Sequence, residues 1–166
     1  MTGILAFDTA LSGCSVAYYG GGKMTRESMT MTHGQAEHLV PMIDRVLDKA
    51  AVQYADIGKV AVTVGPGAFT GLRIGLSAAK SLGLVLKAPV VGFRTLDVIA
   101  RKFRDDCGVR DGETLCVLLD TRRQDFYFQE DGGEPEGIEA TGIESRLADK
   151  SVVFIGDALP RFREQV

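Results

Sequence analysis

Short strand-like runs occupy the start of the chain and give way to a helical pattern. Residues 4–7, 15–19 and 23–30 are apolar or alternate between apolar and polar side chains, and three glycines separate the second run from the third. We therefore expect three antiparallel strands. From about residue 35 the apolar positions recur every 3.6 residues, which predicts a helix that extends to about residue 52.

The following segments alternate between strand-like and helical patterns. We expect a buried strand over residues 60–64, a helix over 70–86, a strand over 90–93 and a helix over 95–104. This order of elements predicts a mixed β-sheet with helices on its faces.

The beginning of the chain recurs in its last third. Residues 116–121 (CVLLDT) match residues 4–9 (ILAFDT) at an offset of 112, and each copy is followed by a strand-like run and a Gly-Gly pair. These coincidences predict an internal duplication. We expect a first subdomain over residues 1–107 and a second, truncated subdomain over residues 108–166.

The second copy has its own predicted elements. They are strands near residues 115–120, 124–130 and 134–140, a short helix near 143–148, a strand over 152–155 and a helix that begins at Ala158.

A glycine-rich run, GPGAFTGLRIG over residues 65–75, connects a predicted strand to a predicted helix. Glycine permits positive φ and close backbone approach, and a helix N-terminus carries N–H groups without intrahelical partners. The spacing matches neither a Walker A loop nor a dinucleotide-binding fingerprint. Two interpretations stay open: a turn that presents N–H groups to an anion or a partner chain, or a tight turn packed beneath its own helix.

Small residues continue at every fourth position along the predicted helix, at Gly71, Gly75, Ala79 and Gly83. Glycine inside a helix costs about 1 kcal/mol relative to alanine, so a close contact should compensate for the stripe. That contact is either this protein's own sheet or a partner.

Composition and charge exclude some functions. The 166 residues carry a formal net charge of −3, which argues against a general nucleic-acid binder. Basic residues dominate 65–104 and acidic ones 130–166, so either one face is basic or the basic side chains only solvate helix surfaces. Three cysteines at unrelated spacings and no long apolar run predict a reducing, cytoplasmic location and no membrane partner.

The candidates for metal and phosphate chemistry are few. The two histidines, His33 and His38, are five residues apart, whereas chelation on a helix needs three or four, so we expect no metal site. Asp8 could bind Mg²⁺, or Asp8 and Asp120 could simply cap hairpin turns. The turn after Asp120 contains no glycine, and we expect Arg122 and Arg123 to obstruct it.

Five motifs together resemble the TsaB (YeaZ) family, the accessory subunits of bacterial tRNA threonylcarbamoyladenosine biosynthesis. They are ILAFDTA at 4–10, CSVA at 14–17, HLVPMID at 38–44, the glycine-rich run at 65–75 and LDTR at 119–122. The resemblance implies a duplicated α/β fold of the actin-like, Hsp70 and sugar-kinase class (ASKHA, RNase H-like).

The resemblance also implies a role. TsaB-like proteins are non-catalytic scaffolds that pair with a TsaD-like catalytic subunit and a TsaE-like ATPase, form homodimers when alone, and meet tRNA through the complex. No cofactor of this chain is implied, and ATP with Mg²⁺ would act through the complex. Two other classes stay open: an actin-like small-molecule kinase or ATPase and, with less support, a metallopeptidase.

Two sets of site residues follow. Degenerate phosphate loops would comprise Asp8, Thr9, Gly65, Gly67, Thr70 and Gly71. The partner interface, which the resemblance assigns to the helices over 35–52 and 70–86, would comprise His38, Leu39, Met42, Leu72, Arg73, Gly75, Leu76, Ala79 and Gly83.

Overall fold

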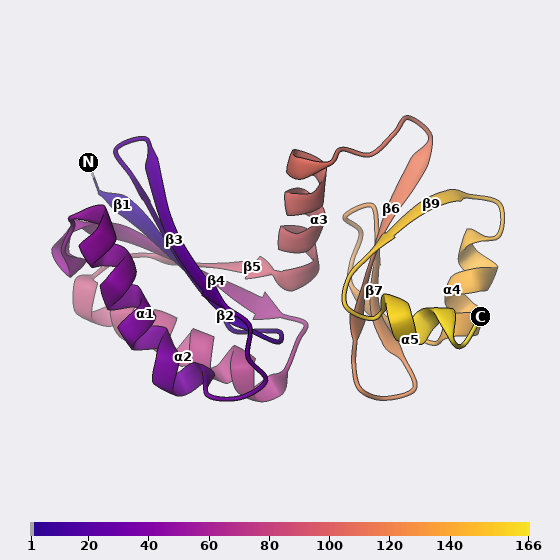
Figure 1. Cartoon of the computed structure of the whole chain (residues 1–166), viewed down its shortest axis with the longest axis horizontal. Helices are drawn as coiled ribbons and strands as arrows, with labels where there is room; N and C mark the ends of the chain where they lie inside the picture. The colour runs from indigo at the N-terminus through magenta and orange to yellow at the C-terminus, as the bar shows by residue number, and fades with distance from the viewer. Residues whose placement is uncertain (1) are drawn as a thin grey trace. The chain divides into compact units, whose positions relative to one another are not determined.

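A computed structural model describes residues 2–166 (Figure 1). The chain divides into two compact units between Phe93 and Arg94. The predicted boundary, between residues 107 and 108, lies one helix later. The intervening helix α3 (Thr95–Asp106), whose Leu96 and Ala100 are buried, packs on strand β6 (Glu113–Asp120) of the second unit, which explains the difference.

The first unit is a five-stranded mixed sheet in the order β3-β2-β1-β4-β5. Strands β1, β2 and β3 form the predicted antiparallel meander, and β4 runs parallel to β1. Its elements are β1 (Gly3–Asp8), β2 (Cys14–Gly20), β3 (Lys23–Met29), α1 (Gln35–Ala50), the short 3-10 helix η1 (Tyr54–Asp56), β4 (Ile57–Gly65), α2 (Phe69–Leu86) and β5 (Val90–Arg94).

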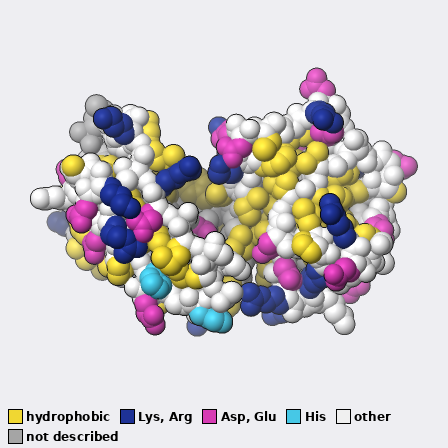
Figure 2. Space-filling view, in the orientation of Figure 1, with side chains coloured by type: hydrophobic (Ala, Val, Ile, Leu, Met, Phe, Trp, Pro, Cys, Tyr) yellow, Lys and Arg dark blue, Asp and Glu magenta, His cyan; other side chains and the backbone are white. Residues whose placement is uncertain are grey.

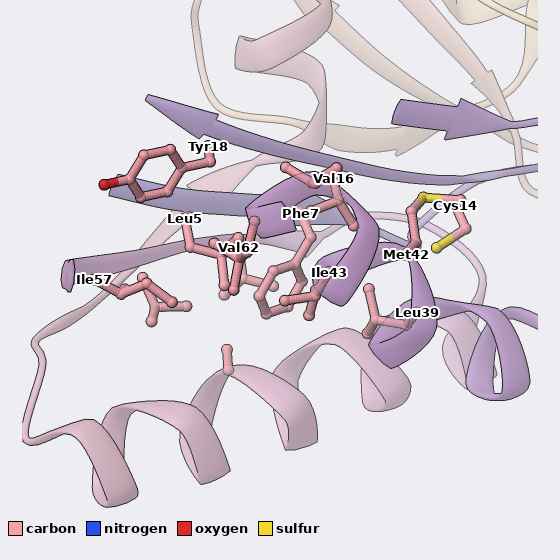
Figure 3. Packing of buried hydrophobic residues seen from close by; sticks show 14 residues of the cluster. Leu5, Phe7, Cys14, Val16, Tyr18, Leu39, Met42, Ile43, Ile57 and Val62 are labelled. Atoms are coloured by element: carbon pink, nitrogen blue, oxygen red, sulfur yellow. The ribbon is translucent and has the colours of Figure 1, made fainter. Parts of the chain in front are cut away.

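Helices α1 and α2 cover the same face of this sheet (Figure 1). Alternate residues of the strands, among them Leu5, Phe7 and Val62, point toward the helices, where Leu39 and Ile43 of α1 meet them (Figure 3). All five side chains are at least 96% buried. Their burial is the main source of stability for the unit.

The opposite face of the sheet is more open. Ile4, Tyr19 and Met24 are paired across three neighbouring strands and are all exposed, with Met24 at 60%.

The second unit is a four-stranded sheet in the order β8-β7-β6-β9. Its core contains Phe126 and Phe128 from the sheet and Phe162 from the last helix, with Phe126 and Phe162 in edge-to-face contact at 5.7 Å. Its elements after α3 are β6, β7 (Phe126–Glu130), β8 (Glu136–Ile138), α4 (Ala140–Leu147), β9 (Ser151–Ile155) and α5 (Leu159–Arg163).

The two sheets repeat one topology, as the duplication predicted. In each unit the first strand pairs antiparallel with the second and parallel with the strand that follows a helix. The aspartates that end the first strands also play the same local role. Asp8 Oδ1 accepts the backbone N–H of Ala10 at 3.2 Å, and Asp120 Oδ1 accepts that of Arg122 at 2.7 Å. Both aspartates therefore cap the turns that follow them.

Candidate functional site

The glycine-rich run lies against the turn that follows β1. The hydroxyl of Thr9 donates a 2.7 Å hydrogen bond to the carbonyl oxygen of Gly71, and Thr9 is 1% exposed. The backbone N–H of Ala68 donates to the carbonyl oxygen of Ala10, also at 2.7 Å. Two polar groups of the turn are therefore paired with the start of α2.

Glycine is required for this contact because the two backbones come very close. A Cβ atom on Gly67 would lie 2.5 Å from the carbonyl oxygen of Ala10, and one on Gly75 would lie 2.7 Å from Thr9 Oγ1. A Cβ atom on Gly71 would collide with the carbonyl oxygen of Thr9. Of the two interpretations of the run, the contacts favour the turn packed beneath its own helix.

Asp8 is the polar centre of this end of the sheet. Its Oδ1 atom accepts hydrogen bonds from the Thr63 hydroxyl and from the N–H of Ala10. Thr63 is not among the predicted site residues, although a threonine in the otherwise apolar run VAVTV at 60–64 is a signal for it. A shallow pocket of about 260 Å³ adjoins Asp8 and is lined further by the turn at Ser12 and Gly13.

The predicted phosphate-loop residues thus differ in what they offer a ligand. The contact between the turn after β1 and the start of α2 involves Thr9, Gly67 and Gly71. Gly65 is buried, with φ at +110°. Thr70 is exposed and Asp8 half-buried. A nucleotide with Mg²⁺ would find one carboxylate here, already accepting two hydrogen bonds, so the residues fit such a ligand poorly.

The turn after β6 is obstructed, but by a different arginine than predicted. Arg122 and Arg123 are exposed. The guanidinium of Arg161, from α5, instead reaches the turn, pairs with Asp120 at 3.1 Å and donates to the carbonyl oxygen of Asp125 at 2.6 Å. No local pattern indicates this contact, because 36 positions separate Arg161 from Asp125.

Residues 2–166 contain no group of three or more His, Cys, Asp or Glu side chains placed to hold a metal ion. His38 lies in α1 and His33 precedes that helix, and both histidine side chains are exposed. Histidine side chains, coloured cyan, are visible on the surface in Figure 2. Cys14 and Cys116 are buried, whereas Cys107 is exposed. Burial raises the pKa of the Cys116 thiol to about 12, so this thiol is unreactive.

Five of the nine residues predicted for the partner interface lie in the interior. Leu39 and Met42 belong to the core, and the stripe residues Gly75, Ala79 and Gly83 are buried. A Cβ atom on Gly83 would collide with Val90 of β5, so this stripe packs on the protein's own sheet. This corrects the interface, since small side chains that face the sheet cannot contact a partner.

The other four predicted interface residues are accessible. His38 and Arg73 are exposed, and Leu72 and Leu76 are half-buried. The guanidinium of Arg73 lies 4.0 Å above the ring of Phe69.

Helix α2 exposes large apolar side chains near its two ends. Phe69 is 68% exposed, Leu84 81% and Val85 77%. By length and composition alone α2 could cross a membrane, the one such helix in the described part of the chain. Its glycine stripe packs on the sheet, however, as in a surface helix of a globular unit.

Much of the basic excess over residues 65–104 is neutralised locally. Arg101 and Lys102 form ion pairs with Asp105 and Asp106 within α3, and Arg94 pairs with Asp97. This favours solvated helix surfaces over a basic face.

The duplicated sheet topology, with paired Asp-Thr turns and a helix-covered face, defines an α/β protein of the actin-like (ASKHA) class. The model of the family described as "TsaD: tRNA N6-adenosine threonylcarbamoyltransferase" matches residues 30–159. The chain belongs to this family and, by its relatives, to the TsaB (YeaZ) group within it.

Two relatives carry the TsaB name, and a solved YeaZ structure shares the fold of this chain. The "tRNA threonylcarbamoyladenosine biosynthesis protein TsaB" of Escherichia coli K12 is 31% identical over 81% of this chain and 57% of that protein. The TsaB of Buchnera aphidicola from Schizaphis graminum is 40% identical over 60% of this chain and 47% of its own. The solved YeaZ from Pseudomonas aeruginosa is 30% identical, with a TM-score of 0.71 over 82% of this chain and 64% of that chain. The chain thus spans about half to two thirds of these relatives.

Proposed function

We propose that this protein takes part in threonylcarbamoyladenosine formation in tRNA as a non-catalytic subunit. It would pair with a TsaD-like catalytic subunit, with a TsaE-like ATPase joining them, and would meet tRNA through that complex. The proposal rests on the names of the relatives, which call TsaB a biosynthesis protein for this nucleoside.

The observation that carries the non-catalytic role is the contact between the glycine-rich run and the turn at Thr9. In an actin-like enzyme that turn would be free to bind phosphate. Here the Thr9 hydroxyl donates to Gly71, and Ala10 accepts from Ala68. These donors and acceptors serve the fold, so a role that leaves the chemistry to another subunit suits this chain better than an ATPase or kinase activity.

The exposed apolar side chains of α2 support the proposal that a partner protein with an apolar surface binds there. Phe69 and Leu84 are 15 positions apart, which brings them to within roughly 60° of each other around the helix. Apolar side chains exposed at both ends of one side of the helix offer contact points to a partner protein. We assign this side of α2, with Arg73 beside Phe69, to the TsaD-like subunit, or to a second copy when the protein is alone.

Reconstitution tests the proposal. A TsaD-like and a TsaE-like protein from the same organism, with tRNA, ATP, threonine, bicarbonate and the enzyme that forms the threonylcarbamoyl adenylate, should modify tRNA only when this protein is added. Modification at the same rate without it would contradict the proposal. The Asp8→Ala variant should support modification as well as the unaltered protein does.

A further inference from the structure

The guanidinium of Arg161 is held on several sides by the second unit. Its Nη2 atom donates to the carbonyl oxygen of Asp125 at 2.6 Å, and Nη1 donates to that of Arg123. Nη1 also lies 3.1 Å from Asp120 Oδ1, and the planar group stacks on the ring of Phe126 at 4.0 Å. Three acceptor oxygens and one aromatic face thus form a cradle, a set of contacts that matches the planar shape and positive charge of a guanidinium.

The turn that forms this cradle is itself well ordered. Asp120 Oδ1 accepts the N–H of Arg122, and Thr121 Oγ1 accepts the N–H of Arg123 at 3.1 Å. The hydroxyl of Thr121 donates to the carbonyl oxygen of Asp125 at 2.6 Å. The carbonyl oxygens of the turn are therefore fixed in direction, which pre-organises them for a cation.

Comparison of the two units indicates which contact of the first unit Arg161 replaces in the second. In the first unit β4 ends at Gly65 (φ +110°), and α2 then approaches the Asp8 turn through Gly67 and Gly71. In the second unit β9 is followed by Gly156 (φ +124°) and then by α5. Direct contact between backbones closes the first turn, whereas an arginine side chain bridges the second.

From this contrast we propose that residues 120–126 form a guanidinium-binding site, with Arg161 as its built-in ligand. The site takes a planar cation with several N–H donors and excludes compact cations and phosphates. Arg161 uses Nη1 and Nη2 in the cradle, while its Nε atom is buried without a hydrogen-bond partner among residues 2–166. The arginine thus stabilises α5 on the turn and keeps the turn closed to nucleotides.

Chemical rescue of an Arg161→Ala variant tests this site. We expect the variant to unfold at a temperature lower by roughly 5–15 °C, because a partly buried, charge-assisted cluster is lost. Millimolar ethylguanidinium chloride should restore several degrees of this loss with saturation, relative to an equal concentration of ethylammonium chloride. Arg163→Ala is the matched control, because Arg163 lies in the same helix but is exposed. It should change the unfolding temperature little and show no rescue.

Two further results test the guanidinium-binding site: the behaviour of a variant that does not fold, and the stability of Arg161→Lys. If Arg161→Ala does not fold, ethylguanidinium but not ethylammonium should recover folded protein by circular dichroism. Arg161→Lys keeps the charge but not the planar donors, and it should retain less than half of the lost stability. An Arg161→Ala variant as stable as the unaltered protein, rescue by ethylammonium to the same degree, or an Arg161→Lys variant of full stability would each overturn the proposal.

Discussion

The side chain of Thr9 and the backbone of Gly71, 62 positions apart, are joined by a buried 2.7 Å hydrogen bond. The bond fixes the Asp-Thr turn of β1 to the first turn of α2. A methyl group at position 71 would occupy the space of the Thr9 carbonyl oxygen. The feature that first suggested an anion site is thus explained by contacts within the fold.

Gly75→Ala should destabilise the protein by about 1–3 kcal/mol, because the new Cβ would lie 2.7 Å from Thr9 Oγ1. The sign of this stability change is informative, because Gly→Ala inside an exposed helix normally stabilises a protein by about 1 kcal/mol. Denaturant unfolding measures the effect. Ser77→Ala, at an exposed position two residues on, is the control and should be neutral or slightly stabilising. A more stable Gly75→Ala variant would show that the stripe does not pack on the turn.

Glu27 should contribute to stability at neutral pH but not in strong acid. Hydrogen bonds from Arg45 and Lys49 lower its pKa to about 2 from an ordinary value of 4.5. Because the folded-state pKa is the lower one, the contribution is present above pH 4.5 and is lost as the pH falls toward 2. Glu27→Gln should therefore be less stable than the unaltered protein at pH 6, with the difference shrinking by pH 3.

The control for this titration is Glu144→Gln, because Glu144 forms no ion pair within residues 2–166. Its stability difference should stay small at both pH values. A Glu27→Gln deficit that is the same at pH 3 as at pH 6 would contradict the assigned cause.

The double change Leu84→Ser and Val85→Ser should weaken binding to the TsaD-like subunit by roughly tenfold or more, because truncating the central apolar residues of an interface costs over 1 kcal/mol. Both side chains are more than three-quarters exposed, so the fold should be unaffected. Isothermal calorimetry measures the affinity and circular dichroism the fold. Tyr19→Ser removes an exposed apolar side chain from the other face of the sheet and should leave the affinity unchanged. Equal losses from both variants would remove α2 from the interface.

The purified chain should hydrolyse ATP no faster than a buffer blank, and Asp8→Ala should not alter that rate. The reason is that Asp8 Oδ1 already accepts from Thr63 and Ala10. Hydrolysis above background that disappears in Asp8→Ala would favour the kinase or ATPase interpretation.

The helices and strands could be predicted because their patterns are local. The strand over 60–64 and the helix over 70–86 correspond to β4 and α2, and the repeated Asp-Thr turns indicated the duplication. Which way the small-residue stripe of α2 faces could not be predicted. A four-residue spacing says that Gly75 and Ala79 share a side of the helix, but not whether that side meets the sheet or a partner.

Contacts between residues far apart in the sequence could not be predicted either. The obstruction of the second turn was predicted, but it was assigned to the adjacent Arg122 and Arg123. Arg161 does this instead, because α5 follows β9, the strand that pairs with β6. The position of α3 was missed for the same reason, since only its packing on β6 assigns it to the second unit.

Mass spectrometry of tRNA nucleosides from cells that lack this protein is the decisive test of the proposed role. We expect N6-threonylcarbamoyladenosine to be lost or strongly reduced and to return when the gene is restored. A gene that encodes Asp8→Ala should restore it equally well. An unchanged level of the nucleoside in the deletion strain, with no second copy of the gene, would contradict a role in its formation.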